Sequence, residues 1–145
     1  MSETTLDIDT IVSDFEASVK DTLDQEKIDA AVARLRSTQT AYPANGTAVG
    51  MIFYYRLTVD IPADNKQFVG NAGGIGGLGG GGFWGDVYTD DLQRLYRSTV
   101  SFQFNATPVY LNVNFFDGSS NLLGNFQSGG VAVLLGTGGG SGGWS

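Results

Sequence analysis

Hydrophobic residues follow two different periods along the chain, and the change between them falls near Pro43. In residues 1–40 apolar side chains recur every three or four positions, as they do on one face of a helix. The first series is Ile11, Val12, Phe15 and Val19, and the second is Ile28, Ala31, Val32 and Leu35. We therefore predict two helices in this part of the chain, or one helix that is broken near residues 22–24.

Residues that cap helices mark where these helices should begin and end. Thr22 followed by Gln25 has the spacing of a capping box, which would open the second helix, and Thr10 suits the N-cap of the first. Arg34 and Arg36 stand where basic side chains stabilise the C-terminal turn of a helix.

After Pro43 apolar and polar residues alternate, which is the two-residue period of a β-strand. We expect two strands within 48–60 and one strand each at 67–73, 80–88, 98–105, 108–116, 121–127 and 130–137. The side chains expected inside are Met51, Phe53, Tyr55, Leu57, Val59, Val100, Phe102, Phe104, Val109, Leu111, Val113 and Phe115. Those expected outside are Ser101, Gln103, Asn105, Tyr110, Asn112 and Asn114.

Gly129 and Gly130 suit a hairpin turn between the last two strands. Strand signals at this spacing indicate a sandwich or a small barrel.

One segment between the strands has a helical pattern instead. Leu92, Leu95 and Tyr96 share a helical face, and Asp90 with Gln93 has the spacing of a helix cap. We predict one short helix here, with Asp90 as its N-cap.

Composition divides the chain at the same place as the hydrophobic period. Residues 1–40 contain no glycine or proline, whereas residues 41–145 contain all 22 glycines and all three prolines. We interpret 1–40 as an acidic helical segment and 41–145 as a glycine-rich β domain. The segment has nine acidic and four basic residues. It either packs on the domain or frays in solution, or else it is a docking or delivery segment that a partner recognises.

Charge and composition exclude several classes of function. The net charge of −7 disfavours nucleic acid and, at neutral pH, anionic lipid, although the sequence pI near 4.2 brings the charge close to zero in acid. Without cysteine or histidine there are no disulfides, zinc sites of the usual kind or histidine-dependent triads. We expect no cofactor and no metal, since the turn that begins at Asp117 offers calcium a single carboxylate.

Nothing in the sequence resembles a membrane span or a leader. No run of 18 apolar residues is present, so we expect no transmembrane segment. The N-terminus lacks the basic and apolar regions of a Sec signal peptide. The chain is therefore expected to be secreted by a non-Sec route after a cytoplasmic stage, or to be a mature form.

The stretch GGIGGLGGGGFWGDVY, residues 73–88, carries the candidate binding surface. It lacks the Gly-Lys-Ser/Thr end of a phosphate loop, and the residues after it are typical of a strand. Its regular apolar insertions argue against a flexible linker. We predict two strands and their connection, with a smooth glycine face.

The candidate binding residues are Gly79, Gly80, Gly81, Gly82, Phe83, Trp84 and Trp144. The terminal GTGGGSGGWS is either a loose tail or a last strand in which Trp144 closes one end of the domain.

Three stretches of the chain resemble the virulence-associated (Vap) proteins of rhodococci. They are FWGDVYTDDLQRLY, TVSFQFNATPVYLNVNFFDGSSNLLG and the terminal GGGSGGW, so the resemblance covers roughly residues 49–144. It implies a mainly β fold: a compact eight-stranded antiparallel β-barrel of two Greek keys, with a short helix and a flat glycine-rich face. It implies no catalytic residues, and it implies a secreted protein that acts inside host phagocytes, in a family of which one member is linked to membrane lipid. The helical segment and the missing signal peptide depart from that pattern.

Three functions follow from these observations. The leading hypothesis is a monomeric, non-enzymatic effector that binds host membrane lipid or a host or partner protein through the glycine-rich face. The alternative is a carbohydrate- or protein-binding module that its N-terminal helices dock to a larger apparatus. The least favoured is a glycosidase-like enzyme that uses Asp86 and Asp117.

Overall fold

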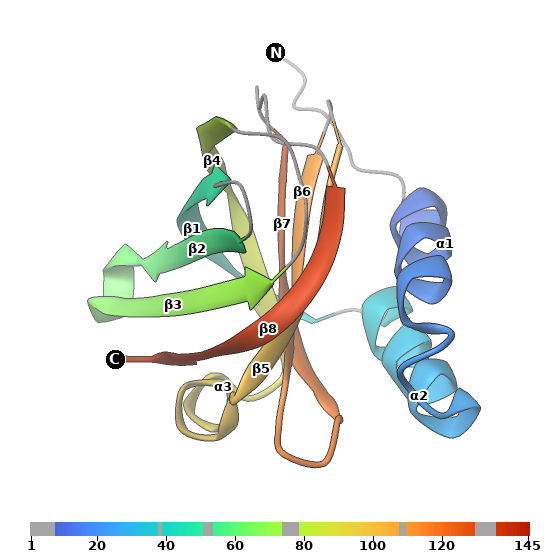
Figure 1. Cartoon of the computed structure of the whole chain (residues 1–145). Coiled ribbons are helices and arrows are strands. Elements are labelled where there is room, and N and C mark those ends of the chain that lie inside the picture. Colours follow the sequence, from blue (N-terminus) through green and yellow to red (C-terminus); the bar gives the residue numbers. More distant parts are fainter. Residues whose placement is uncertain (1–7, 38, 51–53, 74–78, 108–109, 130–135) are drawn as a thin grey trace.

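The chain after Gln39 forms a closed barrel of antiparallel strands, and two helices precede it (Figure 1). The computed structural model describes residues 8–37, 39–50, 54–73, 79–107, 110–129 and 136–145. The helices are α1 (Ile8–Val19), α2 (Gln25–Arg36) and α3 (Leu92–Ser98), with one 3₁₀ turn, η1 (Pro62–Asp64). The strands are β1 (Thr40–Gly50), β2 (Tyr54–Ile61), β3 (Lys66–Gly73), β4 (Gly79–Thr89), β5 (Ser101–Ala106), β6 (Tyr110–Phe116), β7 (Leu122–Gly129) and β8 (Gly136–Trp144).

The strand order around the barrel is β1-β2-β3-β8-β5-β6-β7-β4. Two runs in this order, β4-β1-β2-β3 and β8-β5-β6-β7, each have the 4-1-2-3 arrangement of a Greek key. Every pair of neighbouring strands is antiparallel. The predicted fold class is therefore confirmed: a mainly β, eight-stranded antiparallel Greek-key barrel with an N-terminal helical segment.

One strand begins earlier than the sequence pattern placed it: β1 starts at Thr40, before the first expected strand. The strand expected at 130–137 falls largely outside the described residues, and the last described strand is the glycine-rich β8. Glycine shows no alternation of side chains, so the pattern of β8 cannot be recognised in the sequence. The backbone of β8 is held by β3 on one edge and β5 on the other. The predicted hairpin turn at Gly129 and Gly130 falls largely outside the described residues.

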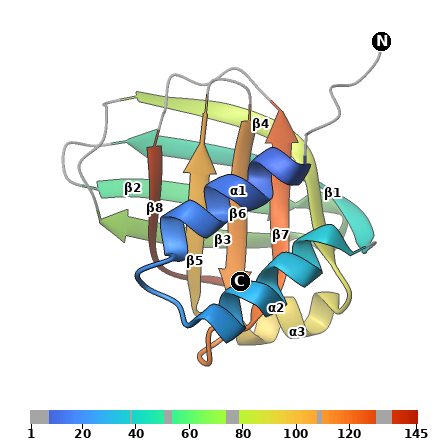
Figure 2. The same cartoon turned by 90° about the vertical axis from the view of Figure 1, so that its right-hand side faces the viewer.

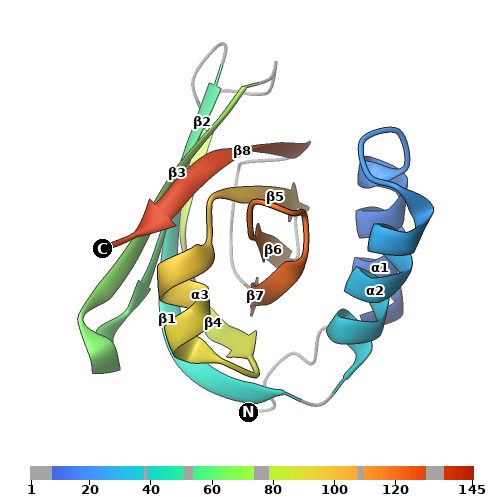
Figure 3. The same cartoon turned by 90° about the horizontal axis from the view of Figure 1, so that it is seen from below.

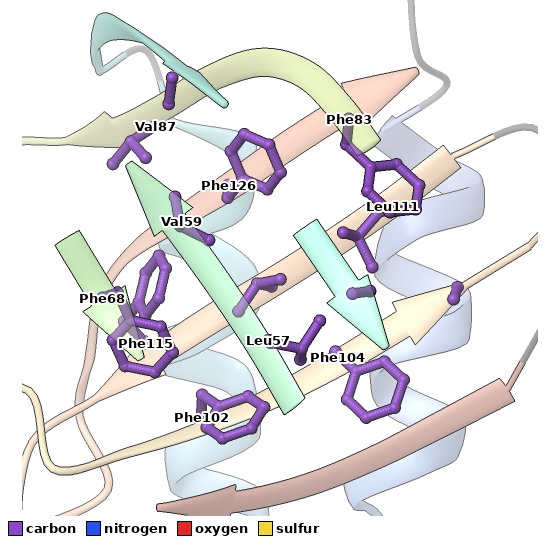
Figure 4. Packing of buried hydrophobic residues seen from close by; sticks show 14 of the residues in the cluster. Leu57, Val59, Phe68, Phe83, Val87, Phe102, Phe104, Leu111, Phe115 and Phe126 are labelled. Atoms are coloured by element: carbon purple, nitrogen blue, oxygen red, sulfur yellow. The ribbon is translucent and has the colours of Figure 1, made fainter. Parts of the chain in front are cut away.

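The barrel is filled by side chains that point inward from all of its strands except β8, whose inward positions are mostly glycine (Figure 4). Phe68 lies near the centre, with ring centroids 5.4 Å from Phe102 and 4.9 Å from Phe115. Most residues expected inside are indeed buried, and Met51, Phe53 and Val109 lie outside the described residues. Val100 is the exception. It is exposed because it precedes the first residue of β5.

The outward positions of β5 and β6 were expected in solvent, and that prediction is wrong. Gln103, Asn105, Tyr110, Asn112 and Asn114 are all buried, and Ser101 is half-buried. The reason is that α1 and α2 lie across the outer face of β5, β6 and β7 (Figure 2).

The helix pair is held to the barrel by a second, smaller apolar core. The ring of Phe15 stacks on that of Phe116, with centroids 6.3 Å apart. The other buried members are Val12, Val19, Ile28, Ala31, Leu35 and Leu122. Polar contacts join the same surfaces: the Lys27 ammonium donates to the side chain of Asn121 at 2.8 Å, and Ser18 accepts from Gln103 at 2.7 Å. The amphipathic face of the segment is thus used by its own barrel.

The two predicted N-terminal helices are present, but their ends differ from the predicted caps. Asp24, not Thr22, is the N-cap residue of α2. The Thr22 hydroxyl instead donates to the carbonyl oxygen of Val19 at 3.2 Å, at the end of α1. Thr10 lies inside α1, which begins at Ile8. In the described part of the chain, no helix has the length and hydropathy needed to cross a membrane.

The short helix α3 is capped by Asp91 rather than by Asp90. The Asp91 carboxylate accepts from the backbone N–H of Arg94 at 3.0 Å. Asp90 instead pairs with Arg34 of α2 at 2.6 Å, and both side chains are substantially exposed. The pattern found the helix but misplaced its start by one residue, because either aspartate can supply a cap.

Asp91→Ala is expected to lower the free energy of unfolding by about 1 kcal/mol, because the N–H of Arg94 loses its acceptor. Urea denaturation followed by circular dichroism measures the loss. Asp90→Ala is the matched control and should lose less, because exposed ion pairs contribute well under about 1 kcal/mol. A larger loss for Asp90→Ala would show that the cap assignment is wrong.

Candidate functional site

The predicted glycine face belongs mainly to β4, which lies between β1 and β7. Alternate residues of a strand point to opposite faces. Gly80, Gly82 and Trp84 therefore point outward, whereas Phe83 points into the barrel. Phe83 is 1% exposed and is part of the core (Figure 4). The prediction that it belongs to the binding face is therefore wrong.

Among the described residues, Trp84 is the most exposed large apolar side chain on the barrel, with 70% of its surface exposed. Its strand neighbours are small: Asn45 stands opposite it on β1 and Gly129 on β7. A Cβ atom added at Gly82 would lie 3.7 Å from the edge of the indole ring. Glycine at position 82 therefore leaves the face flat beside Trp84.

Two further apolar side chains are exposed on the neighbouring strands. Val49 of β1 is 43% exposed and Tyr54 of β2 is 41% exposed. Arg56 of β2 stands opposite Val49 and is also exposed. The outer face of β2, β1 and β4, named here the Trp84 face, thus carries an indole, a phenol, an aliphatic side chain and the cation of Arg56. The carboxylates of Asp60 and Asp86 point outward from the same strands.

The second tryptophan lies elsewhere. Trp144 ends β8, and three strands separate β8 from β4 in either direction around the barrel. Its ring lies 5.6 Å from Phe68, 5.3 Å from Tyr96 and 5.3 Å from Phe115. Figure 3 shows the C-terminus and α3 at the same end of the barrel. The terminal glycine tract is therefore a last strand whose tryptophan packs against the barrel core, and it does not join Trp84 in one site.

Several of the glycines are required by the close approach of neighbouring strands. A Cβ atom at Gly80 would lie 2.8 Å from the carbonyl oxygen of Ala48, and one at Gly142 would lie 2.6 Å from that of Val69. At Gly140 it would overlap the carbonyl oxygen of Asn71 outright. Packing alone explains glycine at these positions, whereas Gly82 has no such constraint.

The carboxylates considered for glycosidase chemistry are apart in the fold, and one is bound within a turn. Asp86 is on β4, whereas Asp117 follows β6 and accepts from the backbone N–H groups of Ser119 and Asn121, both at 2.9 Å. Burial acts to raise the pKa of Asp117, but these hydrogen bonds and the nearby Arg94 outweigh it and hold that pKa below its usual value of 3.8. Among the described residues, no three acidic side chains gather as a metal site would require.

Asp117→Asn is expected to lower the free energy of unfolding by about 1–2 kcal/mol at neutral pH. The folded state lowers the pKa of Asp117, so its contribution is present above the ordinary pKa and disappears as the pH falls through the folded value. Urea denaturation at about pH 7 and pH 3 should therefore show the variant and the original chain converging in acid. A gap that widens in acid would contradict this sign.

A row of buried amides beneath the helices was missed by sequence reasoning. Asn114 donates to Gln103 at 2.8 Å and Asn105 donates to Asn112 at 3.2 Å, across the β5–β6 pair. The sequence does contain these polar residues at alternate positions of both strands. The pattern alone could not show that a helix pair covers them.

The fold and these surfaces define a class of protein, a small Greek-key barrel with a helical cover. The chain belongs to the family of Rhodococcus equi virulence-associated proteins, whose model matches residues 2–145. The match includes the N-terminal segment, whereas the resemblance in the sequence covered roughly residues 49–144.

Two solved structures from the intracellular pathogen Rhodococcus equi are similar to this chain. The virulence-associated protein VapB is 48% identical, with a TM-score of 0.68, and the match covers 74% of this chain and 98% of that one. The virulence-associated protein VapD is 38% identical, with a TM-score of 0.69, and the match covers 75% of this chain and 100% of that one. No curated protein sequence matches.

Proposed function

We propose that this protein is a non-enzymatic virulence-associated effector that contacts a host membrane surface through the Trp84 face. The observation that carries the proposal is the 70% exposure of Trp84 on a face that its glycine and asparagine neighbours leave flat. Family membership supports the virulence role. The proposal requires the chain to leave the bacterium, by a non-Sec route or as a mature form, and to act as a monomer.

Membrane interfaces favour the kind of side chains that this face carries. Tryptophan and tyrosine have an apolar body with one polar atom, and they concentrate where a bilayer meets water. Trp84 would enter that layer first, and Val49 and Tyr54 lie further along the same face, about 13 Å or more from Trp84 along the strands. Burying one such side chain contributes about 1.5–3 kcal/mol, so the contact would be weak and reversible.

The charge of the chain sets the pH at which this contact should be strongest. At pH 7 the net charge is −7, which opposes approach to an anionic bilayer, and near the sequence pI of 4.2 that repulsion vanishes. Co-sedimentation with vesicles of phosphatidylcholine and phosphatidylserine, at about pH 4.5 and pH 7, tests the proposal. Binding should be stronger in acid, and no binding at either pH would overturn it.

The alternative, in which the helices dock the barrel to a larger apparatus, receives less support from the packing. The apolar side chains of α1 and α2 already contact Phe116 and Leu122 of the barrel. A partner would have to recognise the exposed acidic side of the helices.

A further inference from the structure

The seam between α1 and the barrel contains two adjoining hollows. One has a volume of about 360 Å³ and the other about 570 Å³. Both are lined by Ser18 of α1 and Thr137 of β8, so they form one cleft along the seam. Figure 2 shows α1 crossing β6 and β5, with its C-terminal end next to β8. The cleft is on the other side of the barrel from the Trp84 face, because three strands separate β8 from β4.

The cleft combines hydroxyl and amide groups with apolar surfaces. Ser18 and Thr137 supply hydroxyls, while Gln103 and Asn105 supply amides that are 7% and 3% exposed. The apolar part of the lining consists of small residues and of larger aliphatic and aromatic ones: Ala17, Ala106, Gly136, Gly138, Gly139, Val19, Leu23, Phe102 and Phe116. The polar groups are held in place by the barrel and the helix together, so the site exists only when the helices are docked.

Hydrogen bonding within the cleft leaves acceptors available. The Gln103 side-chain nitrogen lies 2.7 Å from the Ser18 hydroxyl, 2.9 Å from the Asn105 side-chain oxygen and 3.0 Å from the Phe104 carbonyl oxygen. The Thr137 hydroxyl follows at 3.5 Å. An amide nitrogen carries two hydrogens, so it cannot serve four acceptors. Oxygen atoms at the cleft surface therefore retain capacity for hydroxyl donors from a ligand.

The charge of the cleft selects the kind of ligand. Asp14 is the one charged side chain in the lining of these two hollows, and no basic side chain lines them. An anionic ligand would meet a carboxylate without a compensating cation. A metal ion would find a single carboxylate, which is a poor hard-cation site. An acyl chain would cover the hydroxyls of Ser18 and Thr137 without forming hydrogen bonds to them.

We propose that this cleft binds a neutral saccharide. A sugar presents hydroxyls that both donate and accept, and it presents C–H faces that pack on small apolar surfaces. The Asp14 carboxylate would accept from sugar hydroxyls while it also accepts from the hydroxyl of Tyr110. The proposal goes beyond the membrane contact and is independent of it, since it uses neither Trp84 nor its neighbours.

Nuclear magnetic resonance titration of the full chain tests this proposal. The probes are maltose, lactose, cellobiose and diacetylchitobiose at up to about 20 mM, with octanoate and glucuronate as apolar and anionic counterparts. At least one disaccharide should shift the side-chain amide signals of Gln103 and Asn105 in a saturable way, and leave the indole N–H signal of Trp84 unchanged. If no disaccharide shifts these amides, or if only octanoate or glucuronate does, the proposal is overturned.

Variants that fill the cleft provide the second measurement. Thr137→Leu and Ala17→Met change exposed positions in the lining, and each should weaken disaccharide binding at least about tenfold. Ser13→Met changes an exposed position of α1 one turn earlier, outside the lining, and should leave binding unchanged. Undiminished disaccharide binding by both cleft variants would overturn the saccharide proposal. Vesicle binding by the same variants would show that the proposed membrane contact does not depend on the cleft.

Discussion

Trp84→Ala is expected to weaken binding to phosphatidylcholine–phosphatidylserine vesicles at about pH 4.5 at least tenfold, while the barrel remains folded. The side chain is 70% exposed, so its removal takes little away from the core. It is also the largest apolar surface that the Trp84 face can insert, and losing about 1.5 kcal/mol of transfer free energy corresponds to a factor of ten. Co-sedimentation gives the partition coefficient, and circular dichroism confirms the fold.

Val100→Ala is the matched control for this measurement. Val100 is another large exposed apolar residue, 49% exposed, but it precedes β5 and lies outside the Trp84 face. Its removal should change the partition coefficient by less than about twofold. Equal losses in the two variants would mean that exposed hydrophobic area in general, and not this face, drives binding. Unchanged binding by Trp84→Ala would refute the proposed contact.

Gly140→Ala is expected to lower the free energy of unfolding by about 3 kcal/mol or more, at the upper end of what overpacking causes. The added methyl group would overlap the carbonyl oxygen of Asn71, so β8 and β3 would have to separate. This seam closes the barrel between its two Greek keys. Urea denaturation measures the loss, and a drop in the yield of folded protein would be the extreme form of it.

Gly143→Ala on the same strand is the control, since the nearest atom to its added methyl group would be 3.9 Å away. Its effect should stay below about 1 kcal/mol. Similar losses in the two variants would mean that glycine in β8 is needed for backbone conformation and not for close strand contact. The pair therefore separates the packing role of the glycine tract from any role as a surface.

Sequence reasoning succeeded where a local pattern has one physical meaning. The apolar series around Phe15 and Ile28 required amphipathic helices, and both helices are present. The alternation around Leu57 and Phe104 required strands with one face in a core. It left β8 open between a strand and a loose tail, because glycine carries no alternation. It misplaced the caps of α2 and α3, where nearby polar residues were equally suitable.

The candidate site could be predicted only in part. Trp84 lies on the exposed surface as expected, but Phe83 and Trp144 are part of the core packing. Neighbours in sequence on a strand point to opposite faces, so Phe83 and Trp84 could not both lie on one surface. Which of the two points inward depends on the register between β4 and β1, and the sequence does not encode this register locally.

The sequence by itself determined the kinds of element in this protein, their approximate limits and its acidic net charge, which approaches zero near the sequence pI of 4.2. Only the tertiary structure decided what those elements cover. The amides of β5 and β6 are buried, and the α1 cleft exists, because a helix pair 65 or more residues earlier in the chain lies on them. Polar residues at every second position of a strand look the same in the sequence whether water or a helix covers that face of the sheet. Only the long-range packing of the helices distinguishes a solvent-exposed face from a covered one.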